Sequence, residues 1–328
     1  MTPDRVVVDA ATRRLAEAFA QTLGSGRVRR GVWLDALTTF RTGGQADWFF
    51  ETRSGREVSA AIRICHEIGL PVTLLGGGSN ALVGELGVRG LVIRLWHGGI
   101  AVPRSGVVRV DAGVTLNGLV RWTISRGLAG LERWAGTPGT VGGGLHGNAH
   151  FQGHLLGDHL VQVGVASRGG HEQQVAPAAL ELGYDTSRLQ HTGEAVLWAE
   201  FEVSQSDPTD LRAIARTSLV FRKQTQPLAA PSAGCIFRNP DPACDHLLGG
   251  PPVSAGALID RVGLKGTSVG GAMVSRLHGN FIVSDGRATA SDIRRLITIC
   301  RETVQQELGV VLRDEIVYLG EFSSSASS

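Results

Sequence analysis

The sequence has few cysteines and no arrangement of them that would hold a metal ion or a disulfide framework. Its 328 residues include only Cys65, Cys235, Cys244 and Cys300, with no CxxC pair and no ligand-like spacing to the ten histidines. A structural zinc site or a disulfide scaffold would need such a pattern. We therefore expect reduced thiols, no bound metal and a cytoplasmic protein.

Long apolar runs and a large net charge are also missing. No stretch reaches 18 apolar residues, and the N-terminal segment reads as a polar start followed by an amphipathic helix. Lys and Arg total 32 against 30 Asp and Glu, for a formal net charge of +2. No basic patch is available for a nucleic acid or an anionic membrane. We expect a protein that is neither exported nor membrane-spanning and whose partner is a small molecule.

Glycine, in contrast, is abundant and clustered. The chain has 45 glycines, gathered in GGGSN at 76–80, GTPGTVGGGLHGN at 136–148 and VGGAM at 269–273. Such clusters allow the backbone to turn tightly or to approach a ligand. Lysine is rare, since Lys223 and Lys265 are the only two, and both positions therefore invite a functional explanation.

Periodicity and turn signals predict mixed helix and strand. In the first half we expect a strand at 47–51, a helix at 54–70 with Cys65 in the core, strands on both sides of 76–80, and a loop over 136–149. In the second half we expect a helix ending at Pro227, a helix capped by Thr289 or Ser291 and stopped by Gly309, with Cys300 in the core, and a final strand at 311–320.

This order predicts an α+β protein with two domains and a short tail. We place a first domain at 1–207, with subdomains at about 25–98 and 99–207, a second domain at 208–320, and a disordered tail at 321–328.

The two larger glycine clusters favour one extended, phosphorylated ligand. Consecutive flexible residues after a strand, as in GGGSN, can aim several N–H groups at phosphate oxygens, although a simple tight turn is the alternative. Neither a GxGxxG fingerprint nor a P-loop is present. Pro138 stiffens the second cluster. A flavin dinucleotide fits two such loops.

Cys235 raises a separate question, because it stands in PSAGCIFRNP at 231–240, where a loop leads into an apolar strand start. A buried structural cysteine is the simplest interpretation. Cys244 and His246, a few residues further on, have no partner spacing and are interpreted as structural or incidental.

Seven motifs in order resemble the UDP-N-acetylenolpyruvoylglucosamine reductase family over about residues 30–320: TTFRTGG, PVTLLGGGSNALV, GLAGLERWAGTPGTVGGG, PSAGCIFRNP, AGALIDRVGLKG, HGNFIV and LRDEIVYLG. The resemblance implies a FAD-binding domain of the vanillyl-alcohol-oxidase (PCMH) type in two α+β subdomains, followed by a C-terminal α+β substrate domain. It also implies a flavoenzyme that uses NADPH to reduce the enolpyruvyl group of UDP-N-acetylenolpyruvoylglucosamine to UDP-N-acetylmuramate. This product serves peptidoglycan synthesis, and with it cell shape and division.

The resemblance also assigns cofactor residues. It places the FAD pyrophosphate on Gly76, Gly77, Gly78, Ser79 and Asn80, and the rest of the cofactor on Pro138, Gly139, Thr140, Gly142, Gly143 and Asn148, with Arg41 and Thr42 alongside.

For catalysis, the resemblance implies that Cys235 stands where most of the family has a proton-donating serine. A thiol suits this role because its pKa lies nearer neutrality than that of a hydroxyl group. Glu315 matches an acidic residue that assists protonation or stabilises the enol, although a solvated edge charge is the alternative. Substrate contacts fall on Tyr184, Arg222, Lys223 and Asn239. A solvated helix end is the alternative for Arg222 and Lys223.

Two departures from the family pattern stand out. In GYDTSRL, Asp185 replaces an arginine associated with the active site, and the family's Asn-Ala-Gly reads Asn-Ala-His at 148–150. An aspartate would oppose the negative charge that builds up as hydride adds. Arg188 is a candidate substitute for the arginine. These changes leave two alternatives open: a FAD-binding paralogue with impaired or no reductase activity, and a flavin oxidase acting on another sugar. The retained Cys235, Glu315 and Lys223 argue against the oxidase. We expect a monomer that binds a UDP-sugar.

Overall fold

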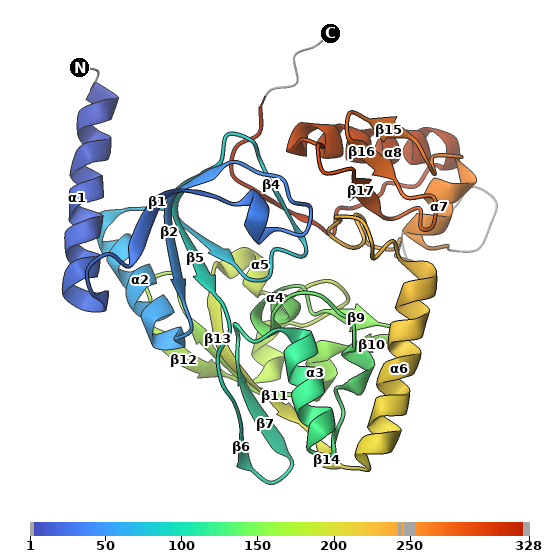
Figure 1. Ribbon diagram of the computed structural model, residues 1–328, viewed down its shortest axis with the longest axis horizontal. Coiled ribbons are helices and arrows are strands. Elements are labelled where there is room, and N and C mark those ends of the chain that lie inside the picture. The colour runs from blue at the N-terminus through green and yellow to red at the C-terminus, as the bar shows by residue number, and fades with distance from the viewer. Residues whose placement is uncertain (1–2, 242–244, 246–252, 324–328) are drawn as a thin grey trace. The chain divides into compact units, whose positions relative to one another are not determined.

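The computed structural model describes residues 3–241, 245 and 253–323 and contains two compact units (Figure 1). Unit 1 consists of Met1–Val32, Ala46–Gly77 and Arg89–Leu219, and unit 2 of Trp33–Gln45, Gly78–Val88 and Val220–Ser328. The expected mixture of helices and strands is confirmed. The domain division drawn from the sequence at 207/208 stays a prediction.

The first sheet of unit 1 has four strands in the order β1-β2-β5-β3, namely β1 (Val28–Trp33), β2 (Gln45–Thr52), β5 (Val88–Leu95) and β3 (Val72–Leu75). Helix α2 (Gly55–Ile68) is capped by Ser54, whose side chain accepts a hydrogen bond from the Glu57 amide, and it ends at Gly69 in the left-handed conformation. Helix α1 (Pro3–Leu23) packs against α2. Cys65 is fully buried in this core, as predicted, and burial raises the pKa of its thiol to about 12.

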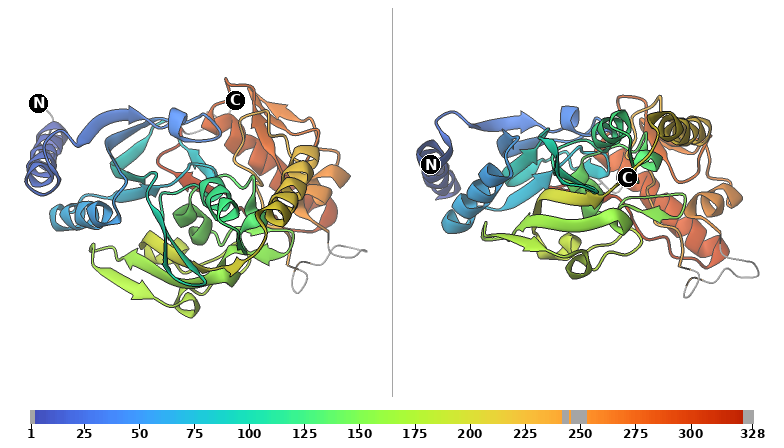
Figure 2. Two further views of the ribbon diagram at one scale, coloured as in Figure 1. Left: turned by 60° about the horizontal axis from the view of Figure 1, so that its bottom comes forward. Right: turned by 90° about the horizontal axis from the view of Figure 1, so that it is seen from below.

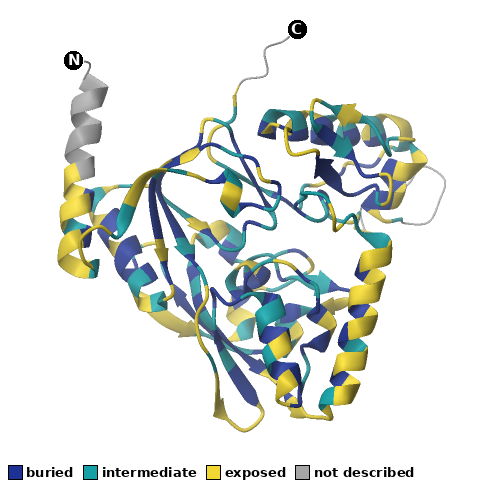
Figure 3. Ribbon diagram, viewed as in Figure 1, coloured by how far each residue is buried: buried dark blue, intermediate teal, exposed yellow. Residues whose placement is uncertain are grey.

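The second sheet of unit 1 is antiparallel, with five strands in the order β12-β11-β13-β7-β6. These are β12 (Glu172–Val175), β11 (Leu160–Ala166), β13 (Ala195–Glu202), β7 (Val107–Asp111) and β6 (Ile100–Arg104). Its apolar residues share a core with α3 (Leu116–Ser125), and buried positions follow these elements through the unit (Figure 3).

The prediction of a loop over 136–149 is wrong in one respect, because this segment contains a short helix, α4 (Val141–His146). Glycine disfavours helix, but tertiary contacts override the propensity here. Thr140 caps the helix by accepting a hydrogen bond from the Gly143 amide, and Val141 and Leu145 are fully buried.

Smaller elements complete unit 1. They are β8 (Leu128–Ala129) with β14 (Ser204–Gln205), β9 (His150–Phe151) with β10 (His154–Leu155), α5 (Leu189–Thr192), and the 3-10 helices η2 (Glu132–Trp134), η3 (Leu156–His159) and η4 (Pro177–Leu180). Helix α6 (Pro208–Thr225) begins in unit 1 and ends in unit 2, before the predicted stop at Pro227.

Unit 2 is built on a three-stranded sheet, β15 (Ser268–Val269), β16 (Ala272–Val274) and β17 (Ile282–Ser284), with α7 (Ala255–Arg261) and α8 (Ala290–Leu308). Helix α8 packs against β15 and β16 (Figure 2). Thr289 caps α8, Gly309 ends it in the left-handed conformation and Cys300 is buried, all as predicted.

The last described strand ties the end of the chain to the segment after the first glycine cluster. Strand β18 (Val317–Leu319) pairs in parallel with β4 (Ala81–Val83), and the short η1 (Asp35–Leu37) belongs to the same unit. Glu321, the first residue of the predicted tail, donates its amide hydrogen to the Gly87 carbonyl. Residues 324–328 of that tail, together with Cys244 and His246, lie outside the described residues.

None of the helices in the described chain combines the length and the apolar character needed to cross a membrane. Within the same residues, no cluster of three or more His, Cys, Asp or Glu side chains could hold a metal ion.

Candidate active site

The segment that carries Cys235 is held by one buried asparagine of unit 2. Asn280 is only 3% exposed, and its Oδ1 accepts a hydrogen bond from the Phe237 amide at 2.9 Å while its Nδ2 donates to the Phe237 carbonyl at 2.7 Å. The Ile236 amide donates to the Asn280 carbonyl at 2.9 Å. Because Ile236 and Phe237 are both buried, the partly buried Cys235 thiol stands beside a fixed anchor. The sequence predicts that a strand begins here, but the structure has only one isolated β-bridge, between Phe237 and Asp314.

Glu315 lies on the chain that runs antiparallel to this segment. Its amide donates to the Ile236 carbonyl at 2.8 Å, and the Arg238 amide donates to the Arg313 carbonyl at 2.9 Å. The backbone of Glu315 therefore pairs with the residue next to Cys235. The structure thus places the backbone of Glu315 beside the segment that carries Cys235, and their catalytic roles stay predictions.

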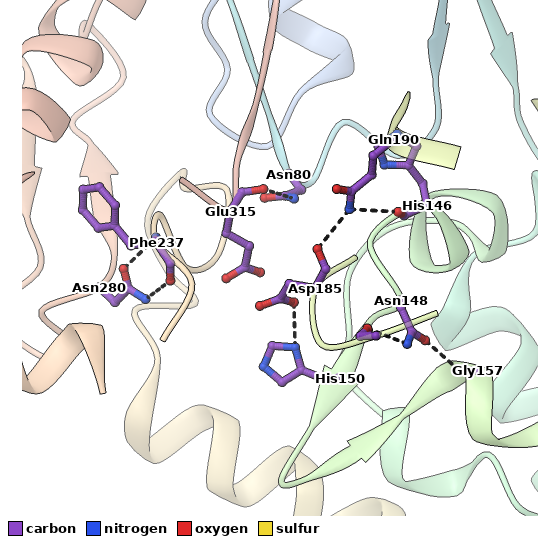
Figure 4. Close-up of polar contacts among 11 residues, drawn as sticks. Asn80, His146, Asn148, His150, Gly157, Asp185, Gln190, Phe237, Asn280 and Glu315 are labelled. Atoms are coloured by element: carbon purple, nitrogen blue, oxygen red, sulfur yellow. Dashed lines mark hydrogen bonds and ion pairs between the residues drawn. The ribbon is translucent and has the colours of Figure 1, made fainter. Parts of the chain in front are cut away.

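Asn80 connects the first glycine cluster to this pair. Its Nδ2 donates to the Glu315 carbonyl at 3.0 Å, and its backbone carbonyl accepts from the Val317 amide at 2.9 Å (Figure 4). Asn80 thus positions Glu315, a role that its prediction as a pyrophosphate contact did not include.

Arg222 and Lys223 are neighbours on α6 but differ in environment. Arg222 is 6% exposed, and burial lowers the pKa of its guanidinium to about 10, while electrostatic interaction with Cys235 acts in the opposite direction. An ionised Cys235 would therefore be stabilised electrostatically by the Arg222 guanidinium. Lys223 is exposed. Asn239 is also exposed, and its Oδ1 accepts a hydrogen bond from the Ala255 amide, the first residue of α7.

In unit 1 the two predicted ligand loops touch each other. A Cβ atom on Gly77 would lie 2.8 Å from the Gly139 Cα, and one on Gly76 would lie 2.6 Å from the Thr140 Oγ1. Only glycine allows this approach at both positions. Asn117 secures the second loop, since its Oδ1 accepts from the Gly136 amide and its Nδ2 donates to the Thr137 carbonyl.

The polar groups of these loops suit a phosphorylated dinucleotide. Within the described chain, the amides of Gly76, Gly77, Gly78 and Ser79 donate no hydrogen bond to protein atoms. The buried Thr42 Oγ1 and Asn80 Oδ1 likewise have no protein partner in that part of the chain. Several unused donors in a glycine-rich turn are what a pyrophosphate requires. The residues present therefore fit FAD.

Other predicted cofactor residues have roles within the protein. The Gly142 amide donates to the Ala112 carbonyl, and a Cβ on Gly142 would lie 3.0 Å from the Ala112 Cβ, so this glycine permits close packing. Asn148 is fully buried; its Nδ2 donates to the Gly183 carbonyl at 2.8 Å and its Oδ1 accepts from the Gly157 amide at 2.9 Å. Their direct contact with the cofactor stays a prediction.

Three site residues hold a left-handed backbone that non-glycine residues seldom adopt. They are Arg41 at φ +57°, Asn148 at φ +46° and Asp185 at φ +51°. Asn and Asp tolerate this region better than Arg does.

The two departures from the family pattern meet in the structure. The His150 Nδ1 lies 2.9 Å from the Asp185 Oδ1 (Figure 4). The His150 ring also lies against the Tyr184 ring, at 4.5 Å between centroids. Arg188 instead forms a two-point ion pair with Glu194, at 3.0 and 2.9 Å. This pair argues against Arg188 as the substitute for the missing arginine.

Three residues that organise the site were not predicted from the sequence: Asn117, Asn280, and His150 in its pairing role. The asparagines act on segments 19 and 43 residues away, and no local pattern indicates such contacts. HGNFIV was noted as a motif, and its asparagine was the one available signal for Asn280.

Comparisons with known proteins identify the family of this chain. Residues 226–319 match the family described as UDP-N-acetylenolpyruvoylglucosamine reductase, C-terminal domain, and residues 46–176 match the family described as FAD binding domain. The chain is 38% identical over 300 residues to the UDP-N-acetylenolpyruvoylglucosamine reductase of Synechococcus sp. (strain JA-3-3Ab), covering 91% of this chain and 93% of the relative.

Two further similarities extend the comparison. The chain is 39% identical over 297 residues to UDP-N-acetylenolpyruvoylglucosamine reductase 2 of Symbiobacterium thermophilum, covering 90% of this chain and 93% of the relative. Its fold is similar to the crystal structure of UDP-N-acetylenolpyruvylglucosamine reductase from Thermus caldophilus, with a TM-score of 0.73 and 33% identity over 89% of this chain and 99% of the other.

Proposed function

The chain belongs to the family of UDP-N-acetylenolpyruvoylglucosamine reductases, FAD-dependent oxidoreductases of peptidoglycan precursor synthesis, and we propose that it carries out their reaction with the residues described above. The substrate is a UDP-sugar and the reductant is NADPH. The observation that carries the residue assignment is the 2.8 Å hydrogen bond from the Glu315 amide to the Ile236 carbonyl. It fixes the acid-bearing residue on the chain that runs beside Cys235.

The glycine-rich loops would hold FAD. The amides of Gly76, Gly77, Gly78 and Ser79 would bind the pyrophosphate, and the polar atoms of Thr42, Asn80 and Thr140 would serve the same cofactor, with Arg41, Pro138, Gly139 and Gly143 along it. When bound, the cofactor supplies hydride transfer from NADPH to the enolpyruvyl double bond.

Cys235 supplies the proton that completes the reduction. Its S–H bond breaks as a C–H bond forms at the carbon next to the one that receives hydride, and the resulting thiolate takes a proton back from solvent. The nearby Arg222 guanidinium stabilises the thiolate. A positioned general acid of this kind contributes about 10²–10⁴-fold to the rate.

The other polar residues bind and orient the substrate. Glu315, whose backbone is held by Ile236 and Asn80, stabilises the enol form. Lys223 is exposed and contacts the substrate phosphates, while Tyr184 and Asn239 contribute further contacts. We also propose that the protein acts as a cytoplasmic monomer.

An anaerobic experiment tests this function. NADPH is added to the yellow holoprotein, and then UDP-N-acetylenolpyruvoylglucosamine. Loss of flavin colour followed by its return supports the reductase. Loss without return on adding this substrate contradicts it and favours a different sugar, whereas no loss of colour favours a protein without reductase activity.

A further inference from the structure

A tight turn places a carboxylate in the interior of unit 1. Gly183 and Thr186 pair in both directions, with N–O distances of 3.0 and 3.4 Å, and Asp185 between them holds φ +51°. Asp185 is only 5% exposed, and its backbone carbonyl accepts a hydrogen bond from the Gln190 Nε2 at 3.0 Å. The turn is thus fixed on both sides of the carboxylate.

This carboxylate has one ring nitrogen, that of His150, as its side-chain partner in the described chain. Its Oδ1 lies 2.9 Å from the His150 Nδ1, whereas its Oδ2 is buried and makes no hydrogen bond to the described residues. Burying a carboxylate is costly unless a cation and hydrogen bonds compensate it. Arg188, the nearest arginine in sequence, is paired with Glu194. The buried charge is therefore matched by His150.

The segments that carry His150 and Asp185 are joined by a second contact. Asn148, two residues before His150, donates to the carbonyl of Gly183, two residues before Asp185, at 2.8 Å. The Tyr184 ring lies against the imidazole, whose side chain keeps 28% of its surface exposed. His150 is thus held in one orientation while part of its ring remains accessible.

We propose that His150, oriented by Asp185, is the positively charged hydrogen-bond donor for the enolpyruvyl carboxylate of the substrate, an inference that rests on the proposed function. An imidazolium has two N–H groups. The one on Nδ1 donates to Asp185, which leaves the one on Nε2 for the substrate. His150 then offsets the negative charge that builds up as hydride adds, the role expected of the family's arginine. Asp185 is a positioning residue that acts through His150.

The two departures from the family pattern, Asp185 and His150, then form one coupled exchange of residues. A chain with arginine at 185 and glycine at 150 carries its cation on the turn, whereas this chain carries it on β9 and uses residue 185 to hold it. Neither substitution is explained alone, because Asp185 without His150 would leave a buried charge unmatched.

Anaerobic stopped-flow measurement of the two half-reactions tests the proposal. In H150Q we expect flavin reoxidation by substrate to slow by about 10²–10³-fold, the loss typical of one preorganised donor, with reduction by NADPH within about twofold of wild type. D185N should slow reoxidation by a smaller factor. The exposed His154 on β10 offers a matched control, and H154Q should leave both half-reactions unchanged.

A double-mutant cycle sharpens the result. H150G and D185R should each be slow, whereas the H150G/D185R double variant should recover most of the rate, because coupled residues are not additive. Wild-type reoxidation rates in both H150Q and D185N would overturn the proposal, provided that the wild-type protein turns over. A wild-type protein that substrate cannot reoxidise would instead count against the proposed function.

A spectroscopic readout keeps the test decisive if H150Q loses FAD or fails to fold. In ¹⁵N NMR of the oxidised wild-type holoprotein, which cannot turn over, the Nε2 resonance of His150 should shift when substrate is added. A resonance that stays in place while the UDP-sugar saturates the protein would overturn the proposal.

Discussion

Asn280 holds Phe237 by both of its backbone polar groups, with hydrogen bonds of 2.9 and 2.7 Å, in a fully enclosed position. The pair fixes the segment that carries Cys235. Replacing Asn280 with Ala would leave two buried backbone groups unsatisfied, each at a cost of about 1–3 kcal/mol. We expect the hydrogen-exchange protection of the Phe237 amide to fall by at least tenfold and kcat to drop.

Asn280→Asp separates the two contacts. The aspartate keeps an acceptor for the Phe237 amide but has no donor for its carbonyl, so its effect should lie between wild type and alanine. If the Phe237 amide keeps its full hydrogen-exchange protection in Asn280→Ala, Asn280 is not needed to hold this segment.

Cys235→Ala should leave flavin reduction by NADPH nearly intact and slow reoxidation by substrate by about 10²–10⁴-fold, because only the second half-reaction needs the proton. Cys235→Ser should recover much of the rate. The buried Cys300 provides the control, since Cys300→Ala should lower thermal stability without a selective kinetic effect. Equal reoxidation rates in Cys235→Ala and wild type would return Cys235 to a packing role.

Gly77→Ala should weaken FAD binding by at least tenfold. The added Cβ would lie 2.8 Å from the Gly139 Cα and would push the two loops apart. At Gly99, which is exposed, the nearest atom to an added Cβ is the Asp111 Oδ2 at 3.5 Å, an ordinary contact, so Gly99→Ala should bind FAD normally. Fluorescence titration of apoprotein with FAD measures both, and equal affinities would contradict the loop assignment.

Lys223→Ala should raise the KM for substrate by about tenfold with little change in kcat, since a phosphate contact contributes to ground-state and transition-state binding alike. Lys265, the other lysine of the chain, lies 2.6 Å from Asp260 and serves as the control, because Lys265→Ala should leave KM unchanged. A loss confined to kcat in Lys223→Ala would be evidence against a phosphate contact.

Low pH should destabilise the contacts of Asn280, which holds the segment that carries Cys235, through protonation of His278. Burial, and to a lesser degree Lys265, lowers the pKa of His278 below its ordinary value near 6.5. Its Nδ1 accepts a hydrogen bond from the Asn280 amide at 3.2 Å, which a protonated ring cannot do. The unfolded chain therefore binds the proton first as pH falls, so stability declines below about pH 6.5. Urea unfolding at pH 8 and pH 5.5 should show a smaller loss in His278→Gln than in wild type.

Local sequence signals predicted the long elements and their ends, and long-range contacts explain most of what they missed. Thr289 and Gly309 bound α8 because capping and left-handed termination are local properties. Strand β1 escaped detection because most of its residues are exposed and lack an alternating apolar pattern. Helix α4 escaped detection because its glycines oppose helix formation, and the burial of Val141 and Leu145 that stabilises it is a tertiary effect.

The same distinction between local signals and long-range contacts applies to the site. Cys235, Glu315 and the glycine loops could be named from motifs, because each motif is contiguous in sequence. The pairing of His150 with Asp185, 35 residues apart, could not be predicted. Each residue taken alone looked like the loss of a residue that the family has at that position. Only the fold places the two side chains against each other.

The left-handed backbone at Arg41 has an evolutionary consequence. Arg41 is exposed and holds φ +57°, a conformation that glycine adopts more readily than arginine does. Asn148 and Asp185 share this conformation, but their buried side chains make hydrogen bonds that glycine would remove. If Arg41 contacts the cofactor, as we propose, selection for heat resistance alone would favour Arg41→Gly and would remove that contact. Lineages under that pressure would drift toward more stable but less active proteins, and Arg41 is where this drift would first be seen.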